Sequence, residues 1–468
     1  MTLPTTPSLR HYAWLFLTVA LFHFAGTWSL PLIDRDEPRF AEASREMLQR
    51  RDYVVPYFNN QYRFDKPPLT YWLQISAYRL FGDNEAAARL PSVLAAAGVA
   101  VILLAWGSRM KDAALGWRAA IIFTLSLQVA LHARAAVADM LLVFFVTLAA
   151  WAGWEMRNAL KVRWWLIAFG ALALGFLAKG PIAWLPLIPI GMQLRSKKDG
   201  LAFAAGVVAM LGLVALWGIP ALERTNGQFF NVGIGKHVVG RSVATMEGHG
   251  AKGLLGYLGT LPFYFLTVFA SFAPWSWFLP RLVGKWRTLW ESEHYLVLLV
   301  VLYFGVFTLV KTKLPHYTLP AFPILALLVA SLLTTLQVRK FAIGMGAFVL
   351  LLSLVVFPWA ARLFPAPAFA AQSAAVLKPE MEFASIEFVE PSLVWSFRKT
   401  VRGFHSKVDS RKAARWMSQP GARFYIGPTN EVAAAFPAPD PGWKIFHHTG
   451  RNFAKGDRTD LTMLLKTD

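Results

Sequence analysis

Stretches of about twenty apolar residues recur along most of this 468-residue chain, and they constrain the fold more than any other feature. An α-helix needs a run of roughly that length to cross the hydrocarbon core of a bilayer. Hydrophobic residues make up 56% of the chain, while Asp, Glu, Lys and Arg make up 16%, below the roughly 25% of soluble domains. The composition excludes a soluble globular enzyme and a disordered chain. It predicts an α-helical protein that crosses a membrane several times.

The apolar runs predict about eleven membrane-spanning helices, within a range of ten to thirteen. No small-residue cleavage site follows the first run, so we interpret it as a retained span rather than a signal peptide. The predicted spans are 11–32, 88–108, 118–134, 137–156, 163–178, 180–194, 201–220, 257–280, 294–310, 317–337 and 341–360.

Lys and Arg are distributed unevenly between the loops that would join these spans. Positively charged short loops stay on the cytoplasmic side of a membrane. With the N-terminus inside, fifteen such cations fall on the cytoplasmic side and four on the other. The four external cations are Arg134, Lys179, Lys311 and Lys313. This pattern predicts external positions for a first loop (33–87), a second loop (221–256) and the C-terminal segment (361–468).

The C-terminal segment differs from the rest in composition. From about residue 372 polar and apolar residues mix, and short strand-like runs alternate with a helix-like one. The predicted strands lie at Ala384–Phe388, Arg423–Ile426 and Leu461–Leu465, and the predicted helix lies at Asp409–Met417. We therefore expect a membrane domain at 1–360 and a small soluble α+β domain at 361–468.

Charge and missing residue types exclude several kinds of chemistry. The net charge of +20 would suit a nucleic-acid binder if the chain were soluble, but most cations flank predicted spans, so no nucleic-acid partner is expected. The chain has no cysteine, which excludes a disulfide, Cys-ligated zinc and a thiol nucleophile. It contains neither a GxGxxG fingerprint nor a phosphate-binding P-loop, so no nucleotide cofactor is expected.

Three carboxylates follow the first predicted span, in the segment DRDEPRF. Asp34, Asp36 and Glu37 stand where a carboxylate is partly desolvated, and such a group acts as a general base or a metal ligand. The alternative is a solvated cap of the helix that follows. That helix, Phe40–Leu48, has the pattern of an amphipathic helix on a membrane surface.

A second cluster, Asp65-Lys66-Pro67-Pro68, closes the first loop. Prolines fix the backbone beside the lysine, and a rigid lysine next to an apolar surface is a good phosphate ligand. The alternative is a loop ion pair followed by a turn. Asp139, at the start of the fourth span, is an ionisable residue near membrane depth and hence a functional candidate. Its alternative role is to interact with the helix dipole.

Two further segments place cations on the face that the positive-inside rule depletes. These are Lys179-Gly180-Pro181 and the segment from Lys311 to Tyr317. An anionic ligand on that face would explain the cations, and snorkelling to lipid headgroups is the alternative. Carboxylates and cations together on one face suit a phosphate-linked lipid substrate, since cations hold the phosphate and a carboxylate activates the acceptor.

Three segments in this order resemble the aminoarabinose transferase branch of the protein-O-mannosyltransferase-like glycosyltransferases, which are membrane enzymes of the GT-C type. The segments are 36–42 (DEPRFAE), 64–72 (FDKPPLTYW) and 313–320 (KLPHYTLP). The resemblance covers about 11–340, whereas 361–468 shows none. The departures are an Asp at position 65, where the family's motif usually has Glu, and eleven predicted spans rather than the thirteen of the aminoarabinose enzymes.

The resemblance implies that a sugar is transferred from a polyprenyl monophosphate carrier to an acceptor at the periplasmic face of the bacterial inner membrane, with inversion. The acceptor would be lipid A or another envelope glycan or glycolipid. It implies Asp36 as catalytic base, with Glu37 in support and Asp139 as a second acid. The remaining implied roles are Arg39, Lys66, Tyr317 and Lys313 as ligands of the carrier phosphate, and Asp65 with His237 as ligands of a divalent metal.

Two other functions remain open from the sequence. One is transfer of the sugar to Ser or Thr of a protein. The other is a lipid-carrier flippase or an anion transporter with a basic cavity, although the paired halves typical of many transporters are not visible in the sequence. Sugar-dependent release of polyprenyl phosphate would separate an enzyme from a transporter.

Overall fold

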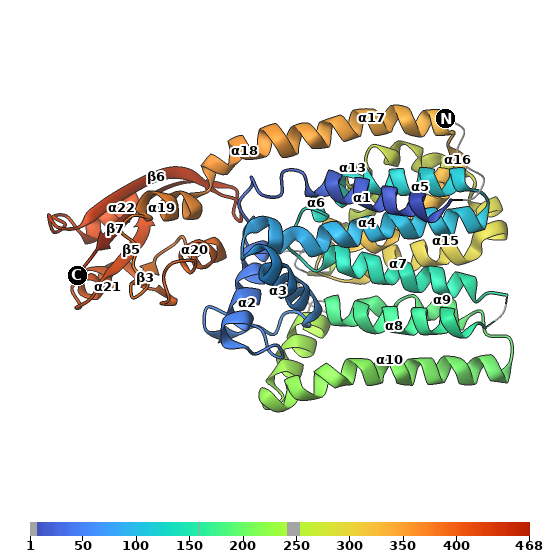
Figure 1. Cartoon of the computed structure of the whole chain (residues 1–468), viewed down its shortest axis with the longest axis horizontal. Coiled ribbons are helices and arrows are strands. Elements are labelled where there is room, and N and C mark those ends of the chain that lie inside the picture. Colours follow the sequence, from blue (N-terminus) through green and yellow to red (C-terminus); the bar gives the residue numbers. More distant parts are fainter. Residues whose placement is uncertain (1–6, 159, 241–252) are drawn as a thin grey trace.

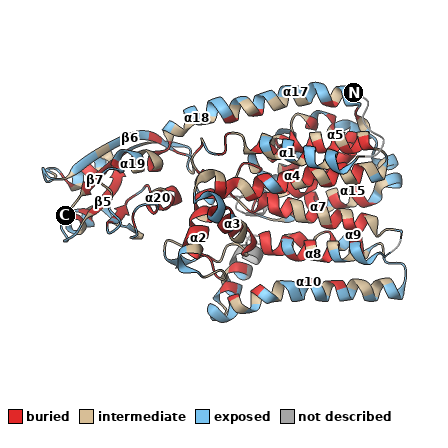
Figure 2. Cartoon of the chain, in the orientation of Figure 1, coloured by how far each residue is buried: buried red, intermediate tan, exposed pale blue. Residues whose placement is uncertain are grey.

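The computed structural model describes residues 7–158, 160–240 and 253–468. Helices run side by side in one large bundle, and a smaller region with a β-sheet sits at one end of it (Figure 1). Two long helices lie at opposite edges of the bundle, α10 (Lys197–Arg224) and α17 (Thr335–Leu351). Figure 2 shows that both are exposed along much of their length, while helices between them are largely buried. A bilayer would cover such apolar, exposed faces.

Among the described residues, six helical segments are long and apolar enough to cross a membrane, and the number rises to seven if one bent pair is a single span. The six are Glu85–Met110, Val162–Lys179, Lys197–Arg224, Trp286–Leu309, Pro315–Leu332 and Thr335–Leu363. Shorter helices occupy several other predicted spans: α1 (Leu9–Phe24), α5 (Ala113–Thr124), α7 (Asp139–Glu155) and α9 (Leu187–Gly191). The number eleven and the orientation of the chain therefore stay predictions.

The centre of the bundle is built by α4 (Glu85–Met110), α5 and α7, with α8 (Val162–Lys179) next to α7. The Asn84 side chain caps α4 by accepting a hydrogen bond of 2.9 Å from the Ala87 N–H. Gly107 of α4 faces Gly116 of α5, and a Cβ on Gly107 would lie 2.6 Å from the Gly116 Cα. Two glycines at this crossing allow the backbones to approach closely, as is common between membrane helices.

The first loop forms helices rather than an extended chain. It contains α2 (Asp36–Arg50), a short hairpin of β1 (Tyr57–Phe58) and β2 (Gln61–Tyr62), and α3 (Leu69–Phe81). The predicted helix Phe40–Leu48 is thus present, but it begins at Asp36. Most of α2 is buried, because α3 packs on one side and α20 (Pro391–Phe397) on another. Neighbouring protein therefore covers α2 on these sides.

The C-terminal region carries a five-stranded mixed sheet with the strand order β4-β3-β5-β7-β6. Strand β3 pairs parallel with β4 and β5, and β7 pairs antiparallel with β5 and β6. The strands are β3 (Glu382–Ser385), β4 (His405–Lys407), β5 (Arg423–Pro428), β6 (Lys444–Asn452) and β7 (Asp457–Lys466). The helices are α19 (Pro365–Ser373), α20, α21 (Ser410–Met417) and α22 (Thr429–Ala435). Three predicted elements match β5, β7 and α21, while β3 begins two residues before its prediction.

Hydrogen bonds and ion pairs join this sheet region to the first loop. The Ser392 N–H donates to Asp34 Oδ1 at 2.9 Å, and Arg35 pairs with Glu390 at 3.4 Å. Further along, Arg398 pairs with Glu42 of α2 at 3.2 Å. The contacts place the C-terminal region directly over the loop that carries the candidate catalytic residues.

Candidate active site

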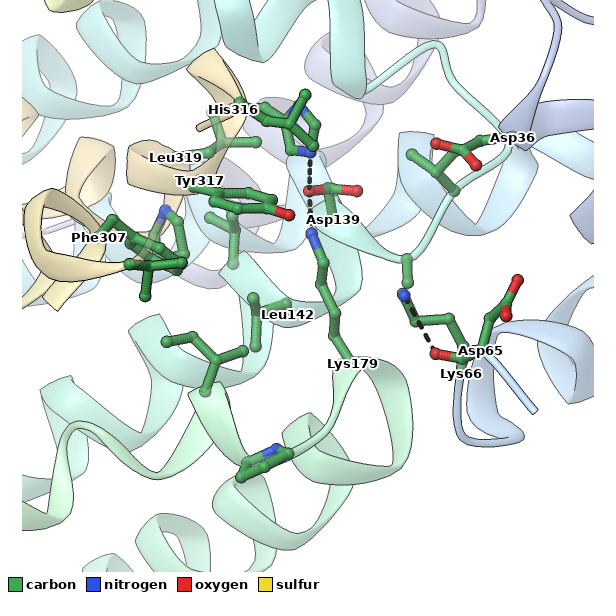
Figure 3. A pocket seen from close by; sticks show the side chains of 18 of the residues that line it. Asp36, Asp65, Lys66, Asp139, Leu142, Lys179, Phe307, His316, Tyr317 and Leu319 are labelled. Carbon is green, nitrogen blue, oxygen red and sulfur yellow. Dashed lines mark hydrogen bonds and ion pairs between the residues drawn. The ribbon is translucent and has the colours of Figure 1, made fainter. Parts of the chain in front are cut away.

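A cavity of about 460 Å³ lies where the first loop meets the ends of α7 and α8 and the start of the segment η4 (Pro315–Ala321). Its walls are apolar except for one group of ionisable and polar side chains, several of which are labelled in Figure 3. That group is Asp36, Arg39, Arg63, Asp65, Lys66, Asp139, Lys179, His316 and Tyr317. The folded chain therefore brings together six of the predicted site residues: Asp36, Arg39, Asp65, Lys66, Asp139 and Tyr317.

Asp36 begins α2 and is exposed at the cavity, where its carboxylate can meet a ligand (Figure 3). Position 36 also lines a second cavity of about 340 Å³, whose walls are mainly apolar and include the segment after α1 and parts of α6 (Leu127–His132) and α17. Asp36 thus stands between two cavities. A carboxylate in that place can contact one molecule from each side.

Glu37, the neighbour of Asp36, points to the other side and does not line the first cavity. It is buried and forms a bidentate ion pair with Arg89 of α4, at 2.9 and 2.8 Å. Glu37 also accepts hydrogen bonds from the Ile33 N–H at 2.7 Å and the Ala136 N–H at 2.6 Å. These contacts tie the start of α2 to α4 and to the segment before α7. They hold the backbone of Asp36 in place, so the geometry supports a positioning role for Glu37.

Cations from the first loop form one wall of the cavity. Lys66 donates a hydrogen bond to the backbone oxygen of Asp65 at 3.1 Å, just before two prolines and the start of α3. Arg63 is buried, pairs with the Asp65 carboxylate at 3.5 Å and donates to the Tyr71 hydroxyl at 3.1 Å. Burial raises the pKa of Tyr71 to about 12, so its hydroxyl keeps its proton and can accept from Arg63. This wall presents fixed positive charge that suits an anion.

The opposite wall carries an ion-pair cluster around Asp139. The Lys179 ammonium, at the end of α8, lies 2.5 Å from Asp139 Oδ1, and His316 Nε2 lies 3.8 Å from the same oxygen. In Figure 3 this oxygen lies between Lys179 and His316. The Lys179 ammonium is also 5.8 Å from the ring centre of Tyr317. Tyr317 and Asp139, which are far apart in sequence, thus belong to one constellation.

Two predicted ligands lie differently from expectation. Lys313 is not among the residues that line the cavity; it is buried, and its ammonium donates to the backbone oxygens of Phe307 at 3.0 Å and Thr308 at 2.5 Å. These carbonyls belong to the last turn of α15 (Trp286–Leu309), so Lys313 caps a helix. The geometry gives it no contact with a phosphate in this cavity.

The predicted metal pair cannot be assembled from the described part of the chain. Asp65 lines the cavity and its carboxylate pairs with Arg63. His237 falls in the segment η2 (Phe229–Gly240), and its side chain lies outside the described residues. The metal at Asp65 and His237 therefore stays a prediction.

Several other residues that meet here had no role predicted from the sequence. The sequence predicted Lys179 only as a cation on the cation-poor face. Its partner Asp139 lies 40 residues away in the chain. His132 lies in the predicted span 118–134, His316 lies in the segment 313–320 beside residues with implied roles, and Arg89 lies in the predicted span 88–108. Each of these residues is ionisable and lies near membrane depth, and that feature alone marks a residue as a functional candidate.

Comparisons with known proteins identify relatives of this chain in sequence and in fold. Residues 65–219 match the family described as dolichyl-phosphate-mannose-protein mannosyltransferase. An uncharacterized protein of Aquifex aeolicus (strain VF5) is 30% identical over 339 residues, which cover 71% of this chain and 75% of that protein. An undecaprenyl phosphate-alpha-4-amino-4-deoxy-L-arabinose arabinosyl transferase of Yersinia pestis (strain Pestoides F) is 31% identical over 340 residues, 68% of this chain. The match spans 58% of that transferase.

Among solved structures, the crystal structure of ArnT from Cupriavidus metallidurans bound to undecaprenyl phosphate has a similar fold. The TM-score is 0.76 and the sequence identity 19%, over 97% of this chain and 98% of that one. The chain therefore shares its fold with ArnT. In sequence the chain is ArnT-like, because it is similar to the mannosyltransferase family over residues 65–219 and to the aminoarabinose transferase over 68% of its length.

Proposed function

We propose that this chain transfers a sugar from a polyprenyl monophosphate carrier to lipid A or another envelope glycan or glycolipid. The reaction takes place on the periplasmic side of the bacterial inner membrane, with the N-terminus in the cytoplasm. The observation that carries the proposal is the cavity where Asp36 meets Arg39, Lys66 and Tyr317. Carboxylate and cations in one cavity match the two needs of the reaction, an activated acceptor and a stabilised phosphate leaving group.

The proposed step is a single displacement at the anomeric carbon. The acceptor oxygen forms a bond to that carbon while the bond from the carbon to the carrier phosphate oxygen breaks. Asp36 takes the proton of an acceptor hydroxyl. Negative charge that develops on the departing phosphate is stabilised by Arg39, Lys66 and Tyr317. Because the acceptor attacks from the face opposite the leaving group, the configuration is inverted.

The two cavities at Asp36 support an assignment of the two substrates. The first has the cations and suits the carrier phosphate. The second is mainly apolar and shares Asp36 with the first, so an acceptor with acyl chains could reach the carboxylate from that side. We propose that the donor occupies the first cavity and the acceptor approaches through the second.

Asp139 and its partner Lys179 belong to the donor side of this arrangement, because they line the first cavity beside Tyr317. We propose that Asp139 positions Lys179 and Tyr317 rather than taking a proton. We also propose two domains, 1–360 for the reaction and 361–468 as a periplasmic cover over the first loop. Asp65 and His237 remain our proposal for a divalent metal.

A second candidate acceptor is a protein Ser or Thr, because the matching family is described as a protein mannosyltransferase. One experiment separates the acceptors. Purified protein in lipid nanodiscs receives polyprenyl-phosphate sugars one at a time, together with an envelope extract that contains glycolipids and proteins. Loss of donor and the mass shift of the product are measured. A shifted glycolipid supports the first proposal, and a shifted peptide supports the second.

The matched variants are Asp36→Asn and, as a control, Asp457→Asn on the exposed start of β7. We expect Asp36→Asn to lower transfer by at least about 10²-fold, since a positioned base contributes about that much or more. The control should transfer normally. Normal turnover of Asp36→Asn would refute the assigned base, and movement of labelled carrier without sugar release would favour a transporter.

A further inference from the structure

Two imidazoles and one carboxylate converge at the wall shared by the active-site cavities. His132 ends α6, Asp139 begins α7 and His316 lies in η4, so three separate elements supply them. One ligand atom from each residue lies within 4.8 Å of the other two. The rings of His132 and His316 have centres 5.0 Å apart. Two neutral imidazoles and a carboxylate at this spacing are a common ligand set for divalent transition metals.

The His132 ring is oriented by a backbone group. Its Nδ1 lies 3.2 Å from the Gln128 backbone oxygen and 3.0 Å from the Gln128 side-chain amide. When Nδ1 carries the proton, it donates to that oxygen and leaves Nε2 unprotonated for the cluster. Histidines that bind metals usually donate their second ring N–H in this way. A metal at Nε2 would therefore select a tautomer for which the hydrogen-bond acceptor is already in place.

We propose that His132, Asp139 and His316 form a binding site for one divalent transition metal ion. Imidazole nitrogen suits zinc, cobalt or iron better than magnesium or calcium, which prefer oxygen ligands. The three residues leave the cavity side open, because His316 and Asp139 line the first cavity. A bound ion would thus keep a coordination position for a water or an anionic group. Binding of the ion can be measured without the transfer reaction, so its failure and the failure of the proposed function are distinguishable.

Lys179 provides a diagnostic feature of this site. Its ammonium pairs with Asp139, one of the three proposed ligands, and that oxygen is also the one nearest to His316. A metal ion at the cluster would feel repulsion from the ammonium in a partly desolvated place. Removal of the lysine charge should therefore strengthen metal binding. If Lys179 and Asp139 formed only a structural pair, the same change would loosen the cluster and weaken metal binding.

The experiment uses full-length protein without a histidine tag, treated with a chelator and titrated with Co²⁺. The visible absorption of bound Co²⁺ gives affinity and coordination, and elemental analysis of Zn²⁺ gives stoichiometry. Wild type should bind one ion at this site. His316→Ala and His132→Ala should each weaken Co²⁺ binding by about tenfold or more. Lys179→Met should tighten it, a result that a misfolded protein would not give.

Two control variants identify the source of any signal. His447→Ala removes an exposed histidine that pairs with Asp460 at 3.0 Å on the sheet, and it should bind like wild type. Asp65→Asn tests the other predicted metal pair and should leave Co²⁺ at this site unchanged. Equal affinity in wild type and His316→Ala would overturn the proposal. So would Co²⁺ binding that is lost in Asp65→Asn but kept in His316→Ala, and so would weaker binding in Lys179→Met.

Discussion

Arg89 of α4 donates two hydrogen bonds to Glu37 of α2, from Nε to Oε1 at 2.9 Å and from Nη2 to Oε2 at 2.8 Å. Both side chains are almost fully buried, with exposed fractions of 2% and 4% for the two residues. Arg89 also donates to the backbone oxygens of Thr27, Leu30 and Pro31. One guanidinium therefore joins α4, the segment that follows α1, and the residue next to Asp36.

Because of this ion pair, we expect Arg89→Ala to lower both the stability of the fold and the rate of transfer. Loss of one partner leaves a buried, uncompensated carboxylate, which costs about 3–5 kcal/mol. We expect a lower melting temperature and slower transfer at saturating donor, since the backbone of Asp36 is no longer held. Thermal unfolding in nanodiscs and initial rates measure the two effects. Unchanged values for both would contradict the positioning role.

One lysine in each of two family-like segments should behave differently from the other. Lys66 lines the cavity, whereas Lys313 caps α15 through two backbone oxygens. We expect Lys66→Met to slow transfer by about 10²–10³-fold, as for loss of one group that stabilises developing charge. Lys313→Met should lower the melting temperature but keep the rate per folded molecule. The contrast is measured on size-selected, folded protein, and equal loss of rate in both would refute it.

Asp34 predicts a pH dependence of stability. Burial raises the pKa of Asp34 to about 7, although the hydrogen bond from Ser392 opposes the shift. Because the folded pKa is above the unfolded value, the folded state is favoured by protonation at low pH, and this contribution is lost as pH rises toward 7. Asp34→Asn keeps an acceptor for Ser392 but has no charge to bury.

The variant should therefore melt at a higher temperature than wild type at pH 8, and the difference should be smaller at pH 5. Melting curves across this range, recorded in the same detergent, check the prediction. A difference between the two proteins that does not change with pH would contradict the raised pKa.

The junction between α2 and α20 depends on Glu42. Its buried carboxylate pairs with Arg45 on the same helix and with Arg398 from the C-terminal region, the latter at 3.2 Å. We expect Glu42→Ala to remove a carboxylate partner from two buried cations, to cost about 3–5 kcal/mol and to loosen the C-terminal region from the first loop. Hydrogen exchange in α20 should rise, while Glu431→Ala in the partly exposed helix α22 should leave it unchanged. Equal exchange in wild type and Glu42→Ala would argue against this anchor.

Local pattern was enough to predict much of the architecture. Long apolar runs, the acids before Pro38 and the mixed composition after residue 372 each depend on neighbours in sequence, so they predicted membrane helices, a helix in the first loop and strands near the C-terminus. The order of three short segments was enough to identify the family, which the comparisons confirm. The helix of the first loop was predicted correctly in type, but the covering by α20 was not.

What the sequence alone determined is the class of protein and six of the residues that line its cavity. The tertiary structure alone decided the partners of those residues. Lys179 meets Asp139 because α8 packs against α7, and His316 joins them because η4 folds back onto the same wall. Likewise, the ammonium of Lys313 turns to the end of α15, and Glu37 turns to Arg89. Such choices depend on which helices pack together and on which buried charges they must satisfy, and neither is a property of neighbouring residues in the chain.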